Sequence, residues 1–491
     1  MANTSGQAGQ ATPAESPARA AFTHGASGFR YRVSRNPSGY TLEFEKAADG
    51  SLRGSKTLAW FVGSGAVARS YLLAADGFLY EAPVAYYSAT ARWDLAPAYD
   101  RYAYPYLTRP VVPPCLNCHA SFLSVVPGTL NRYGAPPFRE GGVACERCHG
   151  PGDAHIQKMR SGAAAGGAAI VNPAKLAPER RDSVCAQCHL SGTVRVMRAG
   201  ASWNTYRAGD RLADSVAVFV RDGVAPGMRV TSHFEKLAQS VCRRASGDKL
   251  WCGTCHDPHT VPGAGEQAAW FRTKCESCHA EGACKETRAN RARRQDDCVA
   301  CHMPKSAVTD AQHVVYTDHS IPRRPRPAAP APSNDAALVA FGGAAASARD
   351  LALAYGIAGD RRRALPLLEE AAENSPGDSE VLLYLAEIYR DSSQPDRAIP
   401  LYRRAMQLDP AQVTASVGLG AILFERGQDA EAITLWQDAL SKNAGLVLTA
   451  TNLAMAQWRS GDRPAAEATL QKVIALSPGF QPARDLLKRL H

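Results

Sequence analysis

The chain has 491 residues, of which 45% are hydrophobic and 21% are charged. This length is enough for about three domains, and the apolar fraction is normal for globular protein, so wholesale disorder and collagen-like structure are excluded. The longest apolar stretches, such as residues 336–348, fall short of the roughly 18 consecutive apolar residues that a membrane span needs, so we expect no membrane span in this chain.

The N-terminal part is expected to be a leader followed by a β domain. Residues 1–28 are small and polar, which predicts a disordered leader. Residues 29–33 and 40–45 alternate between apolar and polar side chains on either side of a turn at 36–39, which predicts a β-hairpin with one buried face. A second hairpin is expected where residues 71–73 and 78–80 meet at Asp76-Gly77. Residues 29–110 are therefore predicted to form a small antiparallel β domain.

The pattern CxxCH occurs six times in the middle of the chain, although composition alone predicts about 0.01 copies. The copies are Cys115-Leu-Asn-Cys118-His119, Cys145-Glu-Arg-Cys148-His149, Cys185-Ala-Gln-Cys188-His189, Cys252-Gly-Thr-Cys255-His256, Cys275-Glu-Ser-Cys278-His279 and Cys298-Val-Ala-Cys301-His302. Chance does not explain this repetition.

CxxCH is the attachment signature of c-type haem. Two cysteines three residues apart can each form a thioether to a haem vinyl group, and the next histidine then lies under the iron as its proximal ligand. The alternatives are a zinc site, an iron–sulfur cluster or a dithiol redox site, but zinc ribbons pair two CxxC units and do not require a histidine after each. The sequence thus predicts six covalently attached haems, held by the twelve motif cysteines, with the six motif histidines as proximal iron ligands.

The net charge of the chain agrees with this interpretation. Residues 111–330 carry 29 basic and 19 acidic side chains, which accounts for the whole net charge of +10. Six haems would bring about twelve negative propionate charges, and arginine is their natural partner because its planar group can bind a carboxylate in a bidentate manner. The positive charge therefore supports bound haem, and no nucleic-acid partner is expected.

Each iron either has a second, distal ligand or keeps that position open. A distal ligand is typical of electron carriers, and an open position is typical of enzymes. The candidate distal ligands outside the motifs are His155, His233, His259, His313, His319 and His24. His491 ends the chain and is expected to be solvated. The methionines at 159, 197, 228 and 303 could replace a histidine at one iron, although methionine is more often a packing residue. Without His24 only five candidates remain, and one iron would stay open.

Two cysteines, Cys242 and Cys284, belong to no CxxCH motif. In an oxidising compartment an even leftover pair suggests a disulfide, and these two flank the fourth and fifth motifs. The alternative is a pair of buried free thiols.

The C-terminal part is expected to be a repeat domain that follows a Pro/Ala-rich linker. Residues 323–340 are predicted to be the linker, and residues 341–491 show a period of 34 residues. The repeats are 345–378, 379–412, 413–446 and 447–480, with a cap at 481–491. Small residues at repeat positions 8 and 20 resemble the tetratricopeptide repeat (TPR), in which they let paired helices approach closely. Such all-α superhelices commonly bind a protein or peptide ligand on the concave side; the alternative is that the repeats only pack against the haem domain.

The combined pattern resembles the multihaem c-type cytochromes of the cytochrome c-552/c-554-like group that carry C-terminal tetratricopeptide repeats. The more specific stretches are residues 246–259 and 298–305, the latter followed by Asp318-His319-Ser-Ile-Pro322. The resemblance implies a multidomain protein in which residues 111–322 form a loop- and helix-rich multihaem domain with little regular structure.

The same resemblance implies an exported protein, so we expect a periplasmic or extracellular location. Members of the group usually begin with a signal peptide and a further CxxCH before the β domain, and residues 1–20 have neither a basic region nor an apolar core. We therefore expect the true start to lie upstream or the chain to be trimmed, with six or seven haems in the complete protein.

These observations favour an electron-transfer protein of the cell envelope that exchanges electrons with redox partner proteins. Each iron would lie between two histidines, and no catalytic residue is assigned. The alternative is a multihaem reductase of a small nitrogen or sulfur oxyanion, in which one iron keeps an open site. A third interpretation makes the repeats primary and the protein an assembly scaffold. The number of distal ligands distinguishes the first two interpretations: six ligands for six irons favour electron transfer, and five leave one iron open.

Overall fold

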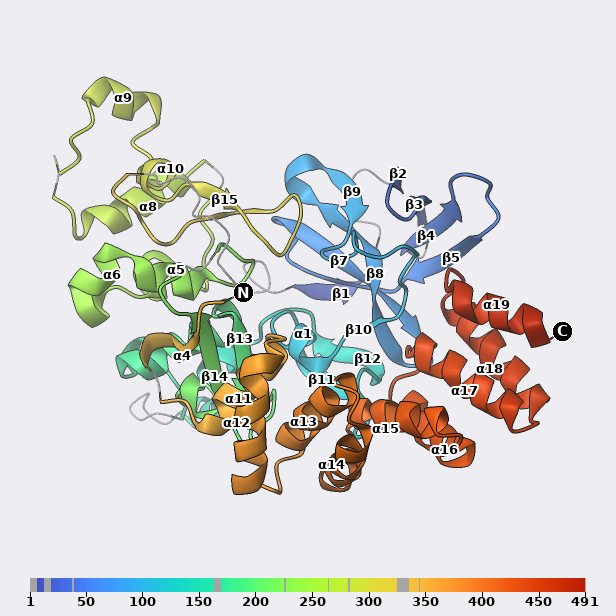
Figure 1. The fold of residues 1–491 in the computed structure, drawn as a ribbon. Coiled ribbons are helices and arrows are strands. Elements are labelled where there is room, and N and C mark those ends of the chain that lie inside the picture. The colour runs from blue at the N-terminus through green and yellow to red at the C-terminus, as the bar shows by residue number, and fades with distance from the viewer. Residues whose placement is uncertain are drawn as a thin grey trace. The chain divides into compact units, whose positions relative to one another are not determined.

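The structure is a computed structural model that describes residues 7–12, 19–37, 39–162, 169–224, 227–263, 265–280, 283–324, 335–343 and 345–490 (Figure 1). The chain divides into two compact units. The first, here called the β–TPR unit, combines Gly6–Gly142 with Ser347–His491. The second, here called the central unit, contains Val143–Ala346. The protein is therefore multidomain, as the sequence indicated.

Antiparallel sheets form the N-terminal half of the β–TPR unit. One sheet has the order β1-β6-β7-β8-β10 with β9 also paired to β8, a second has the order β2-β3-β4-β5, and β11 pairs with β12. The strands are β1 (Ala8–Gln10), β2 (Arg19–His24), β3 (Phe29–Asn36), β4 (Gly39–Lys46), β5 (Arg53–Leu58), β6 (Trp60–Val62), β7 (Ala68–Ala75), β8 (Phe78–Tyr87), β9 (Arg92–Leu95), β10 (Arg109–Pro110), β11 (Ser121–Val125) and β12 (Tyr133–Glu140).

Both expected hairpins are present in these sheets. Strand β3 pairs with β4 in antiparallel register, with Asn36 opposite Gly39, and β7 pairs with β8 across the turn at Asp76-Gly77. The alternation predicted from the sequence places Tyr40 and Leu42 in the core, where neither side chain is exposed to solvent. Gly39 has φ +146°, and a Cβ there would lie 2.5 Å from the carbonyl oxygen of Ala11, so this turn requires glycine.

The expectation of a disordered leader at residues 1–28 is wrong for two segments. Strand β1 pairs with β6, and β2 pairs with β3. Residues 1–6 and 13–18 lie outside the described residues. The β structure also extends beyond residue 110, because β11 and β12 follow the first CxxCH motif within the same compact unit.

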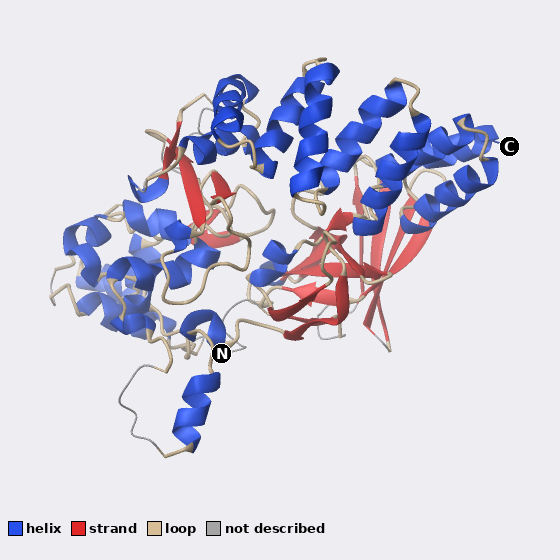
Figure 2. Cartoon of the chain, turned by 90° about the horizontal axis from the view of Figure 1, so that it is seen from below, coloured by secondary structure: helices blue, strands red, loops and turns tan. Residues whose placement is uncertain are grey.

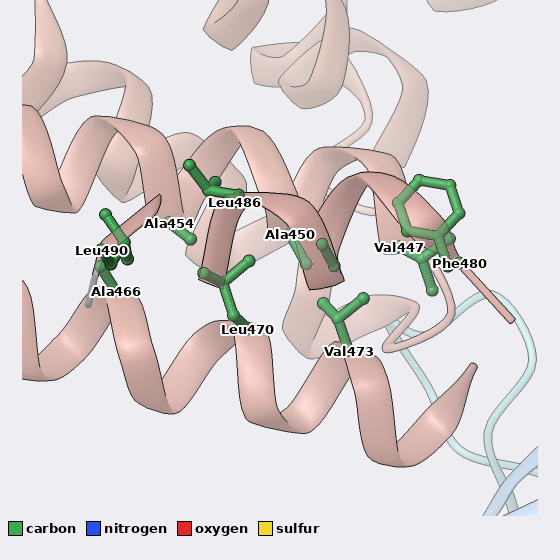
Figure 3. Close-up of a cluster of buried hydrophobic side chains, with 10 residues drawn as sticks. Val447, Ala450, Ala454, Ala466, Leu470, Val473, Phe480, Leu486 and Leu490 are labelled. Atoms are coloured by element: carbon green, nitrogen blue, oxygen red, sulfur yellow. The ribbon is translucent and has the colours of Figure 1, made fainter. Parts of the chain in front are cut away.

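The C-terminal half of the β–TPR unit consists of paired helices that match the 34-residue period (Figure 2). The helices are α11 (Ala348–Ile357), α12 (Arg361–Asn374), α13 (Ser379–Asp391), α14 (Pro395–Leu408), α15 (Val413–Glu425), α16 (Asp429–Lys442), α17 (Val447–Arg459), α18 (Arg463–Leu476) and the capping helix α19 (Gln481–Leu490). The alanines at repeat position 20 are all fully buried, as are those at position 8 in the first, second and fourth repeats. The cap packs its leucines onto the last repeat (Figure 3).

The repeats pack against the N-terminal half of their own unit through the ends of helices α16 and α18 and through Phe480. The ring of Phe480 contacts Tyr104 at a centroid separation of 5.7 Å, and the Lys56 ammonium donates a hydrogen bond of 2.8 Å to the carbonyl oxygen of Ala475. The backbone N–H of Leu130 donates to the carbonyl oxygen of Lys442 at 3.0 Å. These contacts hold the last two repeats against the sheets.

The central unit consists of short helices and small sheets joined by irregular segments. Its helices are α2 (Cys145–His149), α3 (Asp153–Arg160), α4 (Pro178–His189), α5 (His233–Gln239), α6 (Val241–Ser246), α7 (Cys252–Cys255), α8 (Gln267–Glu276), α9 (Arg288–Arg293) and α10 (Cys298–His302). Its strands are β13 (Val194–Met197), β14 (Val216–Arg221), β15 (Lys305–Ala307), β16 (Val315–Thr317) and β17 (Leu338–Ala340).

Strand β17 corrects the predicted linker at 323–340. Its three residues pair with β14, so the end of that segment belongs to a sheet of the central unit. Residues 325–334 lie outside the described residues. Among the described helices, none is long and apolar enough to cross a membrane.

Candidate haem-binding motifs

The first CxxCH motif is built into the core of the β–TPR unit. Helix α1 (Pro113–Asn117) begins with prolines at its first two positions, which suits a short helix because those N–H groups have no intrahelical acceptor. Leu116, inside the motif, is 1% exposed and packs with Leu79 and Val111 of the sheet core. The hydrophobic core therefore fixes the position of Cys115 and His119.

A half-buried ion pair lies beside this first motif. Arg109 on β10 stands directly opposite Glu81 on β8, and its Nη1 lies 3.0 Å from Glu81 Oε2. The Tyr99 hydroxyl donates a 2.7 Å hydrogen bond to the backbone carbonyl of Glu81. Burial raises the pKa of Cys115, Glu81 raises it further, and Arg109 lowers it, so both charges act on the first attachment cysteine.

The other five motifs lie in the central unit, each on or at the end of a short helix. They occupy α2, the last turn of α4, α7, the end of α8 and α10. Residues three apart lie on the same face of a helix, so each turn presents its two thiols together. The local structure therefore suits attachment of each pair of cysteines to one planar group.

Three of the expected distal histidines lie against motif histidines. The rings of His149 and His259 have centroids 6.0 Å apart and planes at 22°, and those of His256 and His319 are 6.1 Å apart with planes at 30°. His189 lies 5.2 Å from His233, with the planes at 89°.

These separations can be compared with the geometry of two imidazoles on one iron. Each metal–nitrogen bond is about 2.0 Å and each nitrogen lies roughly 1.2 Å from its ring centre, so the two ring centres are about 6.4 Å apart. The pairs His149–His259 and His256–His319 lie within about half an ångström of that value. The pair His189–His233 is about 1.2 Å too close and would have to open slightly. The separations of the first two pairs are therefore compatible with one iron between two histidines, whereas His233 lies too close both to His189, at 5.2 Å, and to His319, at 5.0 Å.

Hydrogen bonds orient several of these rings. The Nδ1 atoms of His149, His319 and His302 lie 2.7, 2.9 and 3.2 Å from the backbone carbonyls of Val171, Thr317 and Pro322 respectively. A carbonyl oxygen can only accept, so Nδ1 carries the proton in each ring. The lone pair is then on Nε2, which is the arrangement that a metal-binding histidine requires.

The imidazoles near the middle of the central unit are held neutral. Burial lowers the pKa of His233 to about 3, and the neighbouring His189, His319 and His256 lower it further. Burial also lowers the pKa of His319. In the β–TPR unit burial lowers the pKa of His119. Neutral imidazole is the form that binds iron, so this environment suits ligation.

The remaining expected distal ligands stay predictions. His155 lies half-buried on α3, and His313 is exposed with φ +56°. His24 is the last residue of β2, and its Nδ1 lies 2.8 Å from Ser27 Oγ. This contact belongs to the turn that follows β2. Of the methionine alternatives, Met159 is 52% exposed and Met228 is buried among apolar groups.

Cys242 and Cys284 are free thiols in the structure, as are the twelve motif cysteines, and a disulfide between the two stays a prediction. The two cysteines face different surroundings. Cys242, on α6, lies close enough to raise the pKa of Cys255 and of Cys275. Cys284 follows α8 and instead raises the pKa of the Arg291 side chain.

A buried charged cluster between the third and fourth motifs was not anticipated from the sequence. Asp182 on α4 is 6% exposed, and Arg243 Nη2 on α6 lies 2.7 Å from its Oδ2. Arg181 stacks on Trp251 with its guanidinium 4.8 Å from the ring centroid. The thiols of Cys185 and Cys252 interact beside this cluster, which raises the pKa of Cys185 and lowers that of Cys252. The signal available in the sequence was a charged pair three residues before Cys185 and a tryptophan directly before Cys252.

Across the part of the chain that the structure describes, no group of three or more His, Cys, Asp or Glu side chains is arranged to hold a metal ion.

Comparisons with known proteins identify two regions. Tetratricopeptide repeat models match residues 349–412 and 389–447, so the C-terminal helices are tetratricopeptide repeats. The model for cytochrome c554 and c-prime matches residues 103–150, which include the first two CxxCH motifs. A search of curated protein sequences finds no match.

Three similar solved structures each match over 29% of this chain. MamA shares 24% identity with a TM-score of 0.27, and the match covers 29% of this chain and 82% of that chain. YrrB, described as a TPR protein with an unusual peptide-binding site, shares 20% identity with a TM-score of 0.27 and coverage of 29% and 73%. PilW, a type IV pilus biogenesis factor, shares 27% identity with a TM-score of 0.26 and coverage of 29% and 66%.

Proposed function

We propose that this protein is a multihaem c-type cytochrome that carries electrons in the cell envelope and docks a protein partner on its repeats. Six CxxCH motifs and the match to the cytochrome c554 and c-prime model support haem c. The observation that carries the proposal is the 6.0 Å separation of His149 and His259, two histidines 110 residues apart in sequence, at the distance that one iron between them needs.

The ring contacts suggest how the ligands are shared. His149 and His259 would hold the iron of the second haem, His189 and His233 that of the third, and His256 and His319 that of the fourth. Haem supplies a one-electron iron couple, and an iron with two histidine ligands has no position left for substrate. The polypeptide supplies the axial nitrogens, and backbone carbonyl acceptors fix the protonation of His149 and His319.

The repeats supply a surface for protein partners. Tetratricopeptide helices stack so that one helix of each pair lines a continuous surface that commonly receives a peptide or protein segment. Trp458 and Leu448 on α17 are 47% and 61% exposed, which leaves apolar contact area on this helix. The proposed ligand is a redox partner protein. A periplasmic or extracellular location is part of the proposal, since haem c is attached outside the cytoplasmic membrane.

The test is an intact mass and an EPR spectrum of protein made in a host that attaches haem c. The mass should exceed that of the polypeptide by six haems, and the oxidised protein should be mainly low-spin. His259→Ala should turn one low-spin haem high-spin without loss of covalent haem. The matched control is Asp257→Asn, since Asp257 Oδ1 lies 3.3 Å from the ring of His259 and this change keeps the imidazole. A mass increment near zero, or bound zinc, would refute the proposal.

The reductase alternative is favoured by one observation at the first motif. Arg109 lies close enough to Cys115 for their charges to interact, and an arginine can bind a small oxyanion next to an open iron. If the unmodified protein contains one high-spin haem that binds nitrite or hydroxylamine, the reductase function would replace electron transfer as the interpretation.

A further inference from the structure

Glu235 is a buried carboxylate that joins the two chain segments carrying His189 and His233. It lies on α5, two residues after His233, and is 2% exposed. Its Oε1 accepts a hydrogen bond of 2.8 Å from the backbone N–H of Ser191 and another from the backbone N–H of Gly192. These two residues follow the third CxxCH motif after a single leucine. The carboxylate therefore attaches the start of α5 to the loop that leaves this motif.

Further hydrogen bonds connect the same two segments. The hydroxyl groups of Ser191 and Thr231 are hydrogen-bonded to each other. Arg229 Nη1 donates a hydrogen bond of 3.0 Å to the carbonyl oxygen of Gly192. Residues 229–235 are thus held on the loop at several points, and Glu235 is the part of this attachment that lies beside His233.

The loop itself is fixed on strand β14. The backbone N–H of Thr193 donates a hydrogen bond of 2.7 Å to the carbonyl oxygen of Phe219. Gly192 has φ +60°, and a Cβ there would lie 2.5 Å from Val218 Cγ1 and 2.6 Å from the Phe219 oxygen, so this position requires glycine. The N–H groups that Glu235 accepts from therefore belong to a loop with little freedom to move.

We infer that Glu235 is a positioning residue for the axial ligands of the third haem. The inference rests on the proposed function, in which His189 and His233 hold that iron. The two ring centres lie 5.2 Å apart, and turning of the two side chains can open them by the required 1.2 Å or so while Glu235 keeps the two backbones together. A carboxylate is costly to bury unless it is hydrogen-bonded, and the bonds of this one go to the loop that begins at the proximal ligand.

Loss of the carboxylate should loosen the distal ligand rather than the haem. The thioether bonds do not involve α5, so the haem stays attached when the contacts of Glu235 are removed. The start of α5 can then move away from the loop, and His233 can leave the iron. A ferrous haem between two histidines has no position for carbon monoxide, whereas a haem that has lost one of them binds it. The amount of carbon monoxide bound therefore counts the opened haems.

The experiment measures carbon monoxide bound per molecule of the whole, reduced, haem-loaded chain, together with the high-spin EPR signal after oxidation. His233→Ala is the reference and should bind about one molecule more than the wild type. Glu235→Ala should bind up to that amount, whereas Glu235→Gln keeps an acceptor oxygen and should resemble the wild type. The matched control is Leu338→Ala, which removes a 4% exposed side chain from β17 of the same unit and should lower stability without additional binding.

The outcomes separate this inference from the proposed function. A mass without haem refutes the function, and a His233→Ala protein that binds no additional carbon monoxide refutes His233 as a ligand. Additional binding by His233→Ala but not by Glu235→Ala overturns the inference alone, as does equal binding by Leu338→Ala and Glu235→Ala. If Glu235→Ala does not accumulate in folded form, Glu235→Asp withdraws the carboxylate by one methylene group and should also open the haem. No additional binding by that variant overturns the inference.

Discussion

Gly420 in the third repeat tests whether helix packing in this domain depends on matched pairs of side chains. Repeat position 8 is alanine in the other three repeats, and a Cβ added at Gly420 would lie 2.5 Å from Nε1 of Trp436. Trp436 is 1% exposed, and its Nε1 donates a hydrogen bond to the carbonyl of Val417, so the indole has little room to move. The first and fourth repeats carry leucine at the position of Trp436, namely Leu368 and Leu470.

The expected result of Gly420→Ala is a less stable β–TPR unit. Ordinary van der Waals contact begins at 3.4 Å, so the indole or the helix would have to shift by about 0.9 Å (3.4 − 2.5). Overpacking of this kind costs about 1–3 kcal/mol, and alanine returns about 0.5–1 kcal/mol of helix propensity. The net loss is about 0–2.5 kcal/mol, with a central value of about 1 kcal/mol, which lowers the unfolding temperature by about 2–4 °C in a unit of this size.

The assay is thermal unfolding followed by circular dichroism at 222 nm, with two further variants. Gly377→Ala adds a Cβ in open space and should not destabilise the protein. The double change Gly420→Ala with Trp436→Leu recreates the Ala–Leu pair of the first and fourth repeats, so it should cost less than the sum of the two single changes by about 1 kcal/mol or more. A Gly420→Ala protein that unfolds at a higher temperature than wild type would refute the packing argument.

Four further results are expected. Because the raised pKa of Glu81 means that the folded state holds its proton more tightly, the free energy of unfolding should fall by on the order of 3 kcal/mol between pH 4.5 and pH 8, and Glu81→Gln should flatten this dependence in denaturant titrations. Phe480→Ala should cost about 3–4 kcal/mol in urea unfolding, since the ring is 7% exposed against Tyr104; a loss below about 1 kcal/mol would contradict this contact. Asp182→Asn should destabilise the protein by about 3 kcal/mol because Arg243 loses its buried partner, whereas the exposed Asp214→Asn should have little effect by the same measurement. His319→Ala should give one additional high-spin haem by EPR with an unchanged intact haem count, and an unchanged spectrum would exclude it as a ligand.

The repeat domain was predictable because its signal is local and occurs four times. Each repeat contacts mainly its neighbours, so the helix boundaries depend on nearby residues such as Ala364 and Pro376 rather than on distant ones. The hairpins were predictable for a similar reason, since a short turn joins two alternating strands.

The first strand was missed because its signal lies elsewhere in the chain. Residues 8–10 are Ala-Gly-Gln, which have little intrinsic preference for a strand. Their partner is β6, where Phe61 stands opposite Gly9, and a Cβ at Gly9 would lie 2.9 Å from that ring. Gly9 must be small because Phe61, 52 positions later in the chain, lies against it. The composition of residues 8–10 alone shows only that they are small and polar.

The histidines were predicted as a set but not as pairs. Matching six irons to six histidines outside the motifs selects candidate ligands but gives no distances between them, and His233, His259 and His319 do lie against motif histidines. The pairing of His149 with His259 depends on how α2 and the segment after α7 meet, and no local pattern contains that information. The same counting included His24, whose contact with Ser27 belongs to a β turn.

The position of the first cysteine in the sequence was also a poor guide to the domain boundary. The first motif opens the cysteine-rich stretch, and the sequence therefore suggested a boundary at residue 110. Leu116 is nevertheless a core residue of the β sheet, and the compact unit continues to Gly142. Covalent attachment of haem requires two thiols and a histidine on one helical turn. Any domain that holds such a turn rigidly can provide an attachment site. A motif therefore marks where a group is bound, whereas the burial of residues such as Leu116 marks which domain holds it.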